Sequence, residues 1–312
     1  MTEIIGLNPV LIFAEACDRG KVREENQDRV RHATTALGEL VIVADGIGGY
    51  RGGATASQMV VDRIEASIAA RAAGYSPPRA IAEAAAEANG AVFDAAASGD
   101  PAFRNMGSTV VLALITQDAG KTQAWIGHIG DSRAYLMRKG GLARLTRDHS
   151  AVQEMLDRQE ITLEQAKTSP QASVLTRSLG HMREVEIEIS IVDLEIGDIL
   201  LLCSDGLWGF VAEQAIERVL TAPGQEIDKA AAELLNLALE AGGHDNIGIQ
   251  IVSQSAPAEP ASATLDQAVS KSPRSSGLST TLILCLMALI ALAVIVWFAQ
   301  EQHWLFPIHL SK

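Results

Sequence analysis

The sequence predicts an α+β protein in which two mainly antiparallel sheets carry helices on their outer faces, followed by one transmembrane helix. Apolar runs of strand length recur through the first 253 residues, and turn-forming triplets such as Asp118-Ala119-Gly120 and Lys139-Gly140-Gly141 separate successive runs. Long crossover helices between successive strands are mostly missing, which disfavours a parallel sheet. With 48% apolar residues in a chain of 312, a sizeable core is feasible.

Strand-like and helix-like segments occupy most of this region. The predicted strands cover residues 11–17, 40–44, 109–115, 123–129, 132–137, 185–192, 199–204 and 247–252. Two alanine-rich helices are predicted over residues 54–73 and 78–97, and two shorter helices follow Ala212 and Glu226. Residues 1–253 therefore form one predicted domain.

An apolar run without a charged residue covers residues 278–299. A membrane-spanning helix needs about 20 such residues, whereas a buried globular helix rarely lacks a polar face over this length. The Ser-, Ala- and Pro-rich residues 254–277 are predicted to be a flexible linker. Lys271 and Arg274 precede the run and Glu301 follows it. The positive-inside rule therefore leaves the large domain in the cytoplasm and residues 300–312 as a short extracytoplasmic tail.

The overall charge narrows the classes of partner. A net charge of −13 and a pI near 5.0 argue against nucleic-acid binding, which needs a basic face. An anionic phosphate substrate would require local positive charge, which metal ions held by carboxylates can supply. The three cysteines contain no CxxC pair, so the sequence suggests neither a zinc site nor a disulfide scaffold.

Four aspartates directly follow apolar or strand-like segments: Asp45, Asp131, Asp205 and Asp245. A single Asp-Gly pair is ordinarily a turn, but four such aspartates in one domain are harder to explain in this way. If they converge, they raise one another's pKa unless a cation lies between them. Oxygen ligands suit Mg²⁺ or Mn²⁺, and two such ions roughly 3.5–4 Å apart can hold a bridging water or hydroxide for in-line attack on phosphorus.

A charged segment near the N-terminus offers groups that could hold phosphate. It contains Arg19, Arg23 and Arg29, with Asn26-Gln27-Asp28 beside them. The planar fork of arginine suits a phosphate dianion. Taken alone, such a segment is more often a solvated loop, so the residues themselves leave both interpretations open.

Eight segments occur in an order that resembles the metal-dependent PPM/PP2C-type protein phosphatases in their bacterial form. They lie between about residues 14 and 252 and read RGKVREENQD, DGIGGYRGGATAS, MGST, GDSRAYL, LTRDHS, LTRSLG, CSDGLWG and GGHDNIG. Each motif is weak alone, but the ordered set is highly specific. The resemblance implies a four-layer α/β/β/α sandwich with metals in a cleft at one end of the sheets, and hydrolysis of phosphoserine and phosphothreonine on proteins.

The resemblance also assigns roles to metal ligands. Asp45 would bridge two Mn²⁺ or Mg²⁺ ions, and Gly46 would offer its backbone carbonyl to one of them. Asp205 and Asp245 would ligate the other ion. Asp131 matches the position that helps to hold a third, weaker metal in the family.

Three further residues have roles implied by the resemblance. Arg23 would bind the substrate phosphate, Asp28 would orient a metal-bound water, and Asn246 would steady the loop that carries Asp245. Residues 145–180 lie where the family has a mobile flap beside the cleft. Most charged side chains of that segment are more simply the solvated face of a short helix.

Two positions depart from the family pattern. The aspartate that often follows CSDGLW is Gly209 here, which removes one expected ligand of the third metal. The histidine that animal members carry after Asp-Gly is Ile47 here. Bacterial relatives usually have an apolar residue at that place, so Ile47 does not indicate an inactive enzyme.

Other residues with reactive side chains have simpler interpretations. His128 is expected to be a core histidine satisfied by hydrogen bonds, and His149 is expected to fix the start of the flap. His244, beside Asp245, is a candidate proton donor. Cys203 is expected to be an inert buried thiol, and Ser132 lacks the GxSxG motif of a nucleophilic serine.

Rival functions fit the sequence less well. An aspartyl-phosphate enzyme would need a DxD motif, which Asp45-Gly46-Ile47 lacks, and no P-loop motif is present. A catalytically inactive, membrane-tethered phosphoprotein-binding regulator is the alternative, although it has no need for three carboxylates. For an enzyme we expect phosphorylated proteins as substrates, a cognate serine/threonine kinase as partner, and attachment to the bacterial inner membrane through residues 278–299.

Overall fold

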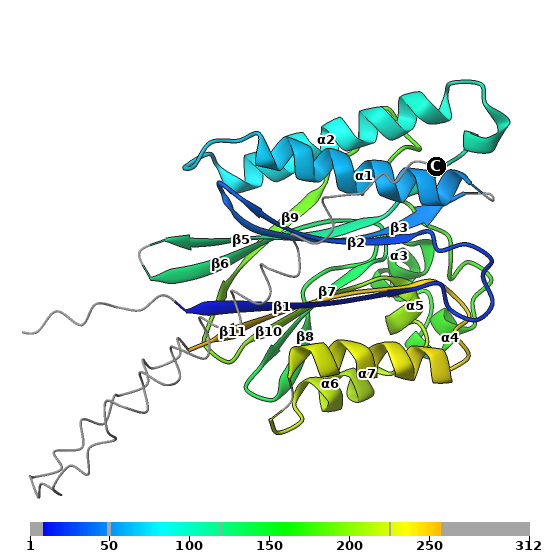
Figure 1. Cartoon of the computed structure of the whole chain (residues 1–312). Helices are drawn as coiled ribbons and strands as arrows, with labels where there is room; N and C mark the ends of the chain where they lie inside the picture. The colour runs from blue at the N-terminus through cyan, green and yellow to red at the C-terminus, as the bar shows by residue number, and fades with distance from the viewer. Residues whose placement is uncertain (1–8, 49–50, 119, 225, 257–312) are drawn as a thin grey trace, which may run out of the picture. The chain divides into compact units, whose positions relative to one another are not determined.

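The computed structural model describes residues 9–48, 51–118, 120–224 and 226–256 (Figure 1). The chain divides into two units, Met1–Glu259 and Pro260–Lys312, and every described residue belongs to the first. The predicted membrane helix (278–299), the predicted tail (300–312) and the predicted linker beyond residue 256 lie outside the described residues. Within the described ranges, no helix is long and apolar enough to cross a bilayer.

Two antiparallel sheets form the centre of the first unit. Sheet A consists of β1 (Val10–Asp18), β7 (Arg133–Arg138), β8 (Gly141–Arg144), β10 (Ile199–Cys203) and β11 (Ile247–Ser255). Sheet B consists of β2 (Asp28–Thr35), β3 (Gly38–Ile47), β4 (Gly107–Ser108), β5 (Val110–Asp118), β6 (Lys121–Ile129) and β9 (Glu188–Leu194). The strand orders are β1-β11-β10-β7-β8 and β2-β3-β5-β6-β9, with β4 paired to β3.

Helices cover the outer face of each sheet (Figure 1). Two long helices, α1 (Gly52–Ala69) and α2 (Pro77–Ala96), pack on sheet B, while α6 (Glu213–Leu220) and α7 (Ile227–Glu240) pack on sheet A. The shorter helices are the 3₁₀ turn η1 (Pro101–Phe103), α3 (Ala151–Asp157), α4 (Leu163–Lys167) and α5 (Asp205–Trp208). The predicted four-layer α/β/β/α architecture is confirmed.

The alternation of side chains along β3 explains how the layers hold together. Leu40, Ile42 and Ala44 face α1, whereas Val41 and Val43 face sheet A, and all five are fully buried. Successive residues of a strand point to opposite faces, so a strand between a helix layer and a second sheet must be apolar throughout. This is why β3 reads as a continuous apolar run.

Strand β11 lies inside sheet A, between β1 and β10. All nine residues of β1 pair with it, from Val10 opposite Ser255 to Asp18 opposite Ile247. The first and last described strands are therefore neighbours. Sheet A is completed by a strand from the end of the described chain.

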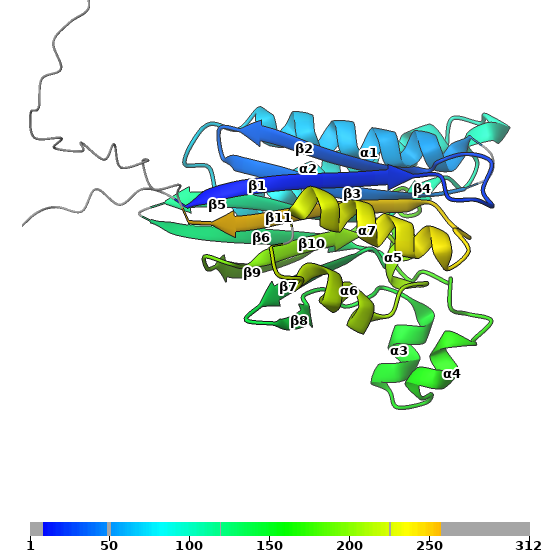
Figure 2. The ribbon, with the colours of Figure 1, turned by 60° about the horizontal axis from the view of Figure 1, so that its bottom comes forward.

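The segment predicted to be a flap contains α3 and α4, which project at one end of the sandwich (Figure 2). Ser150 caps α3 by accepting a hydrogen bond from the Gln153 amide, and Thr162 caps α4 in a capping box with Gln165. The prediction of a short helix in this segment is confirmed.

Three element predictions need correction. The charged segment beside Arg23 could have been a solvated loop, but from Asp28 onward the chain forms β2, an edge strand of sheet B that was not among the predicted strands and pairs with β3. β10 ends at Cys203, and Asp205 opens α5 instead of ending a strand. Asp245 precedes β11, so it enters a strand and does not leave one.

Candidate metal centre

Carboxylates from several elements meet at the end of the sandwich where α5 and the loop between β1 and β2 lie (Figure 1). Asp28 opens β2 and lies opposite Asp45 of β3 in the antiparallel register. Asp205 opens α5, and Asp245 lies in the turn before β11. The charges of neighbouring carboxylates, that of Asp245 among them, raise the pKa of Asp45 and of Asp205, because the structure brings the predicted ligands together.

The acidic residues are strongly perturbed by their surroundings. Burial raises the pKa of Asp45 and of Asp205 well above the usual range, and the neighbouring carboxylates raise both further. Asp28 is 1% exposed, and burial raises its pKa to about 7. Its Oδ2 accepts a hydrogen bond from Ser204 Oγ at 2.6 Å, while its Oδ1 is buried without a hydrogen-bond partner among the described residues. Such a group is unfavourable unless a cation lies close to it.

The donor set fits a hard divalent cation. Carboxylate oxygens are the ligands that Mg²⁺ and Mn²⁺ prefer, and positive charge between Asp45, Asp205 and Asp245 would remove their mutual repulsion. Nitrogen and sulfur donors, which favour zinc, are missing from this set. The residues present therefore fit the metals that the sequence predicts.

Gly46 allows α1 to begin close to Asp45. A Cβ atom at this position would lie 2.1 Å from the carbonyl oxygen of Gly53, which no relaxation of a side chain could relieve. The Gly46 amide donates to the carbonyl of Gln27 at 3.2 Å, and Gly46 pairs with Ser108 of β4. Its expected role as a carbonyl ligand stays a prediction.

Arg23 supplies positive charge at the acidic group. Its Nη2 donates to Asp245 Oδ2 at 2.7 Å, and its side chain is 55% exposed. The hydrogen bond and the charges of Asp245, Asp205 and Asp45 raise the pKa of the guanidinium. Arg23 thus reaches the carboxylates while keeping much of its fork open to solvent, as a phosphate-binding arginine requires.

Asn246 holds the loop that contains Arg23 against the Asp245 turn. Its Nδ2 donates to the carbonyls of Arg19 at 2.8 Å and Glu25 at 3.0 Å. Its Oδ1 accepts from the Gln27 amide at 2.8 Å. One buried side chain therefore fixes three points of a loop more than 200 residues away in sequence.

Asp131 lies beside this group and is linked to the base of the flap. Burial raises its pKa to about 6, with a further contribution from Asp148. Trp208 Nε1 donates to the Asp131 carbonyl at 3.0 Å, and Arg133 lies over the Trp208 ring at 3.4 Å. Arg133 also donates to both carboxylate oxygens of Asp148, at 3.0 and 2.7 Å. The contacts of Arg133 with Asp148 and Trp208 were not predicted. In the sequence, only the presence of the GDSR and RDHS motifs pointed to these residues.

Gly209 occupies the place where the family often has an aspartate. A Cβ atom there would lie 2.7 Å from the carbonyl oxygen of Asp205, the same oxygen that accepts from the Gly209 amide at 2.8 Å. The tight turn at the end of α5 therefore favours glycine. The expected third-metal site keeps Asp131 but has no acidic side chain at residue 209.

The remaining candidates have mixed outcomes. His149 fixes the start of the flap as predicted, since its amide donates to the Gly130 carbonyl at 2.7 Å. Cys203 is fully buried, which confirms the predicted burial, and burial raises the pKa of its thiol. The expectation for His128 is wrong: it is buried, but neither ring nitrogen has a hydrogen-bond partner among the described residues.

His244 packs on Phe210 with ring centroids 5.5 Å apart, and Ser132 shares a 2.7 Å hydrogen bond with Thr109.

Sequence reasoning missed Ser204, which contacts Asp28 directly. Its Oγ donates to Asp28 Oδ2 and accepts from the Gly248 amide at 2.8 Å. The residue ties β10 and β11 of sheet A to β2 of sheet B. The only available signal was its position immediately before Asp205.

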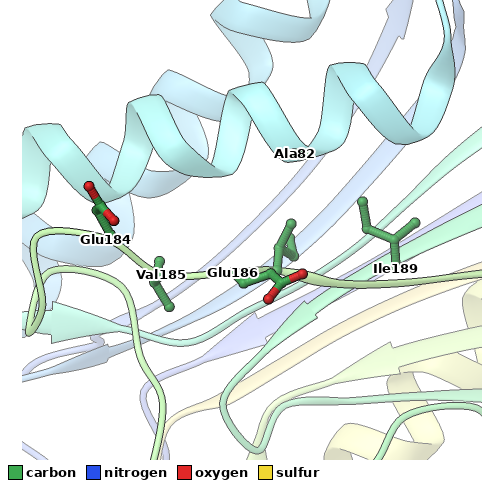
Figure 3. Close-up of a pocket in the computed structure, with 6 residues that line it drawn as sticks. Ala82, Glu184, Val185, Glu186 and Ile189 are labelled. Atoms are coloured by element: carbon green, nitrogen blue, oxygen red, sulfur yellow. The ribbon is translucent and has the colours of Figure 1, made fainter.

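A surface pocket of about 620 Å³ lies under α2, away from this acidic group (Figure 3). Its lining is Ala82, Glu184, Val185, Glu186, Ile187 and Ile189. Figure 3 shows Glu184 and Glu186 on the segment before β9. Two carboxylates and no cation among the lining residues make this pocket unsuitable for a phosphoryl group, so it does not compete with the acidic group for that role.

Comparison with known proteins places this geometry in context. Residues 20–240 match the family model described as protein phosphatase 2C. The chain is 37% identical over 243 residues to the serine/threonine protein phosphatase PstP of Mycobacterium tuberculosis, covering 78% of this chain and 45% of PstP. It is 37% identical over 239 residues to the protein phosphatase PhpP of Streptococcus pneumoniae, covering 76% of this chain and 94% of PhpP.

A solved structure shows the same likeness. The catalytic domain of PstP in complex with two manganese ions matches with a TM-score of 0.69 and 33% identity, covering 80% of this chain and 100% of that one. The chain thus spans about half of the full length of PstP (45%). It covers the whole of the PstP catalytic domain in that solved structure.

Proposed function

The chain belongs to the protein phosphatase 2C family, and we propose that it hydrolyses phosphoserine and phosphothreonine on proteins with Mn²⁺ or Mg²⁺ as cofactor. The observation that carries this proposal is the convergence of Asp45, Asp205 and Asp245, whose charges repel in the absence of a cation, beside Arg23. The mycobacterial and streptococcal relatives named as protein phosphatases support it.

The chain's own residues have distinct tasks in this reaction. When bound, two ions supply positive charge for the phosphoryl oxygens and generate a nucleophile from water. Arg23 exchanges its contact with Asp245 for the phosphoryl oxygens, which its fork can hold bidentately. Asp28, with a pKa raised by burial, orients the attacking water and can hold its proton.

Turnover separates this proposal from its rival, an inactive phosphoprotein-binding regulator. We expect the full-length chain in detergent, and residues 1–256 alone, to hydrolyse an aryl phosphate ester and phosphopeptides with Mn²⁺ or Mg²⁺. EDTA should abolish turnover, and Asp45→Asn should lower it by a factor on the order of 100 or more. The matched control is Asp62→Asn, an exposed aspartate of α1 that pairs with Arg31. Phosphopeptide binding without turnover by the metal-loaded protein would favour the regulator.

A membrane anchor is the second part of the proposal. The uncharged length of residues 278–299 and the cations Lys271 and Arg274 before it support a single spanning helix with the phosphatase domain in the cytoplasm. In a bacterium this places the enzyme on the inner membrane. Tethering would favour membrane-bound phosphoproteins, including those modified by a cognate serine/threonine kinase, through a raised effective concentration.

A further inference from the structure

Three side chains outside the acidic group gather at the root of the flap: His128, His149 and Glu188. One potential ligand atom from each lies within 4.8 Å of the others. His128 is on β6, Glu188 opens β9, and His149 follows β8 at the start of the flap segment. None of the three takes part in the proposed phosphatase chemistry.

The fold determines this grouping. His128 and Glu188 are directly opposite partners in the β6–β9 register, so their side chains lie on the same face of sheet B. That face is turned toward sheet A, since Ile126, two residues before His128, belongs to the core between the sheets. His149 is held in place by two contacts with Gly130: its amide donates to the Gly130 carbonyl at 2.7 Å, and its Nδ1 accepts from the Gly130 amide at 3.2 Å.

These contacts leave the other nitrogen of His149 facing the carboxylate. Because Nδ1 accepts a hydrogen bond, the neutral ring carries its proton on Nε2, which lies 3.1 Å from Glu188 Oε2. A metal-binding histidine carries its proton on the nitrogen away from the ion, so an ion at Nε2 requires the proton to lie on Nδ1 and the Gly130 amide to give up its hydrogen bond. A simple hydrogen bond between His149 and Glu188 is the competing explanation.

His128 is the observation that a simple hydrogen bond does not explain. Its side chain is 2% exposed, its ring packs on that of His149 with centroids 4.7 Å apart, and neither of its nitrogens has a hydrogen-bond partner among the described residues. Main-chain groups of Ser132 and Gly130 lie near the ring and raise its pKa, but burial lowers that pKa more strongly. A buried imidazole without partners is costly, and an ion between the two rings would satisfy it.

The environment favours the neutral form of both rings. Burial lowers the pKa of His128 to about 3 and also lowers that of His149, so both imidazoles are neutral at pH 7. The side chain of Glu188 is 52% exposed, which gives an ion a route from solvent and room for a water as fourth ligand.

We propose that His128, His149 and Glu188 bind one divalent transition-metal ion, with zinc as the preferred occupant. Two imidazoles and one carboxylate are a ligand set that zinc, cobalt and nickel bind well and that magnesium binds poorly. Binding at Nε2 of His149 moves the ring proton to Nδ1, so both rings bind as neutral imidazoles. The ion would tie the start of the flap to β6 and β9 and oppose local opening of that segment.

Cobalt provides the test, because Co²⁺ with nitrogen ligands in a four-coordinate site absorbs visible light far more strongly than Co²⁺ in a six-coordinate oxygen site. The full-length chain in detergent is titrated with Co²⁺ in excess Mg²⁺. We expect one equivalent with strong visible bands that Zn²⁺ displaces. Asp45→Asn should leave these bands in place, which separates this site from the acidic one.

Substitutions identify the ligands. Glu188→Gln and His149→Gln should each weaken the strong-band binding at least about tenfold. Glu186→Gln, an exposed glutamate two residues away, is the matched control and should bind as the unmodified chain does. Glu188 is exposed, so its variant tests the proposal even if a change at buried His128 prevents folding. Absence of strong bands, or bands unchanged by Glu188→Gln, would overturn the proposal whatever the phosphatase assay shows.

Discussion

Asp28 and Asp45 occupy directly opposed positions on β2 and β3, so two carboxylates share one rung of sheet B. Ser204 reaches across from the other sheet and donates to Asp28 at 2.6 Å. Burial raises the pKa of Asp28 and this hydrogen bond lowers it. The balance between the two effects determines whether Asp28 is ionised near neutral pH.

Ser204→Ala removes the hydrogen bond that lowers the pKa of Asp28. The pKa should rise further, so the acidic limb of the pH–rate profile should move to higher pH and activity at pH 7 should fall several-fold. The pH dependence of kcat measures this shift. Ser67→Ala, a change at another buried serine, is the control for general destabilisation and should leave the profile in place. An unshifted acidic limb in Ser204→Ala would contradict the role given to Ser204.

Arg23→Ala should mainly weaken substrate binding. A bidentate, charge-assisted contact to phosphate contributes about 1.5–3 kcal/mol, so KM for a phosphopeptide should rise by a factor on the order of 10 to 100. Arg23→Lys keeps the charge without the fork and should give an intermediate KM. Arg79→Ala, at an exposed arginine of α2 that pairs with Glu83, serves as control. An unchanged KM in Arg23→Ala would exclude a phosphate contact.

The stability of the metal-free domain should decline as pH rises. The folded-state pKa of Asp28 is about 7 against an ordinary value of 3.8, and that of Asp131 is about 6. A raised pKa contributes stability that is complete below the unfolded-state value and is lost as pH rises through the folded-state value. Urea midpoints of residues 1–256 in EDTA should therefore fall between pH 4 and pH 7, and Mn²⁺ should restore them. Midpoints that rise over this range would contradict the assignment.

Gly209→Ala should destabilise the domain, because its Cβ would lie 2.7 Å from the Asp205 carbonyl oxygen. We expect a loss of about 1–3 kcal/mol in the free energy of unfolding, as for other overpacked sites. Gly90→Ala in α2 is the matched control: a Cβ there meets no atom within 4 Å, and alanine should stabilise the helix by about 0.5–1 kcal/mol. Equal thermal shifts in the two variants would show that the turn at Gly209 tolerates a side chain.

Deleting residues 278–312 should release the protein from membranes without loss of activity, since every residue of the acidic group precedes residue 256. Fractionation of cells that produce the full-length and shortened chains measures this. The shortened chain should be found in the soluble fraction with unchanged kcat. Its continued sedimentation with membranes would count against the anchor.

The sequence predicted the strands that are buried on both faces. β3 and β5 are covered on both faces and read as apolar runs, so they could be recognised without a structure. β2 could not, because an edge strand with polar residues on it looks like a loop. The aspartates were identified by their flanking residues, but the Asp28–Asp45 register and the Ser204 contact depend on pairing between distant segments. The unpaired state of His128 depends on packing that no local pattern records.

The position of β11 has a consequence for biosynthesis. Because this strand lies between β1 and β10, the last described strand to leave the ribosome completes the middle of sheet A and not its edge. Until it emerges, the nine residues of β1 have no partner and Asp245 has not reached the other carboxylates. The nascent chain therefore cannot assemble its acidic group before the domain is complete. Any shortened version that ends before Ser255 leaves backbone hydrogen-bonding groups of β1 without their partners in β11.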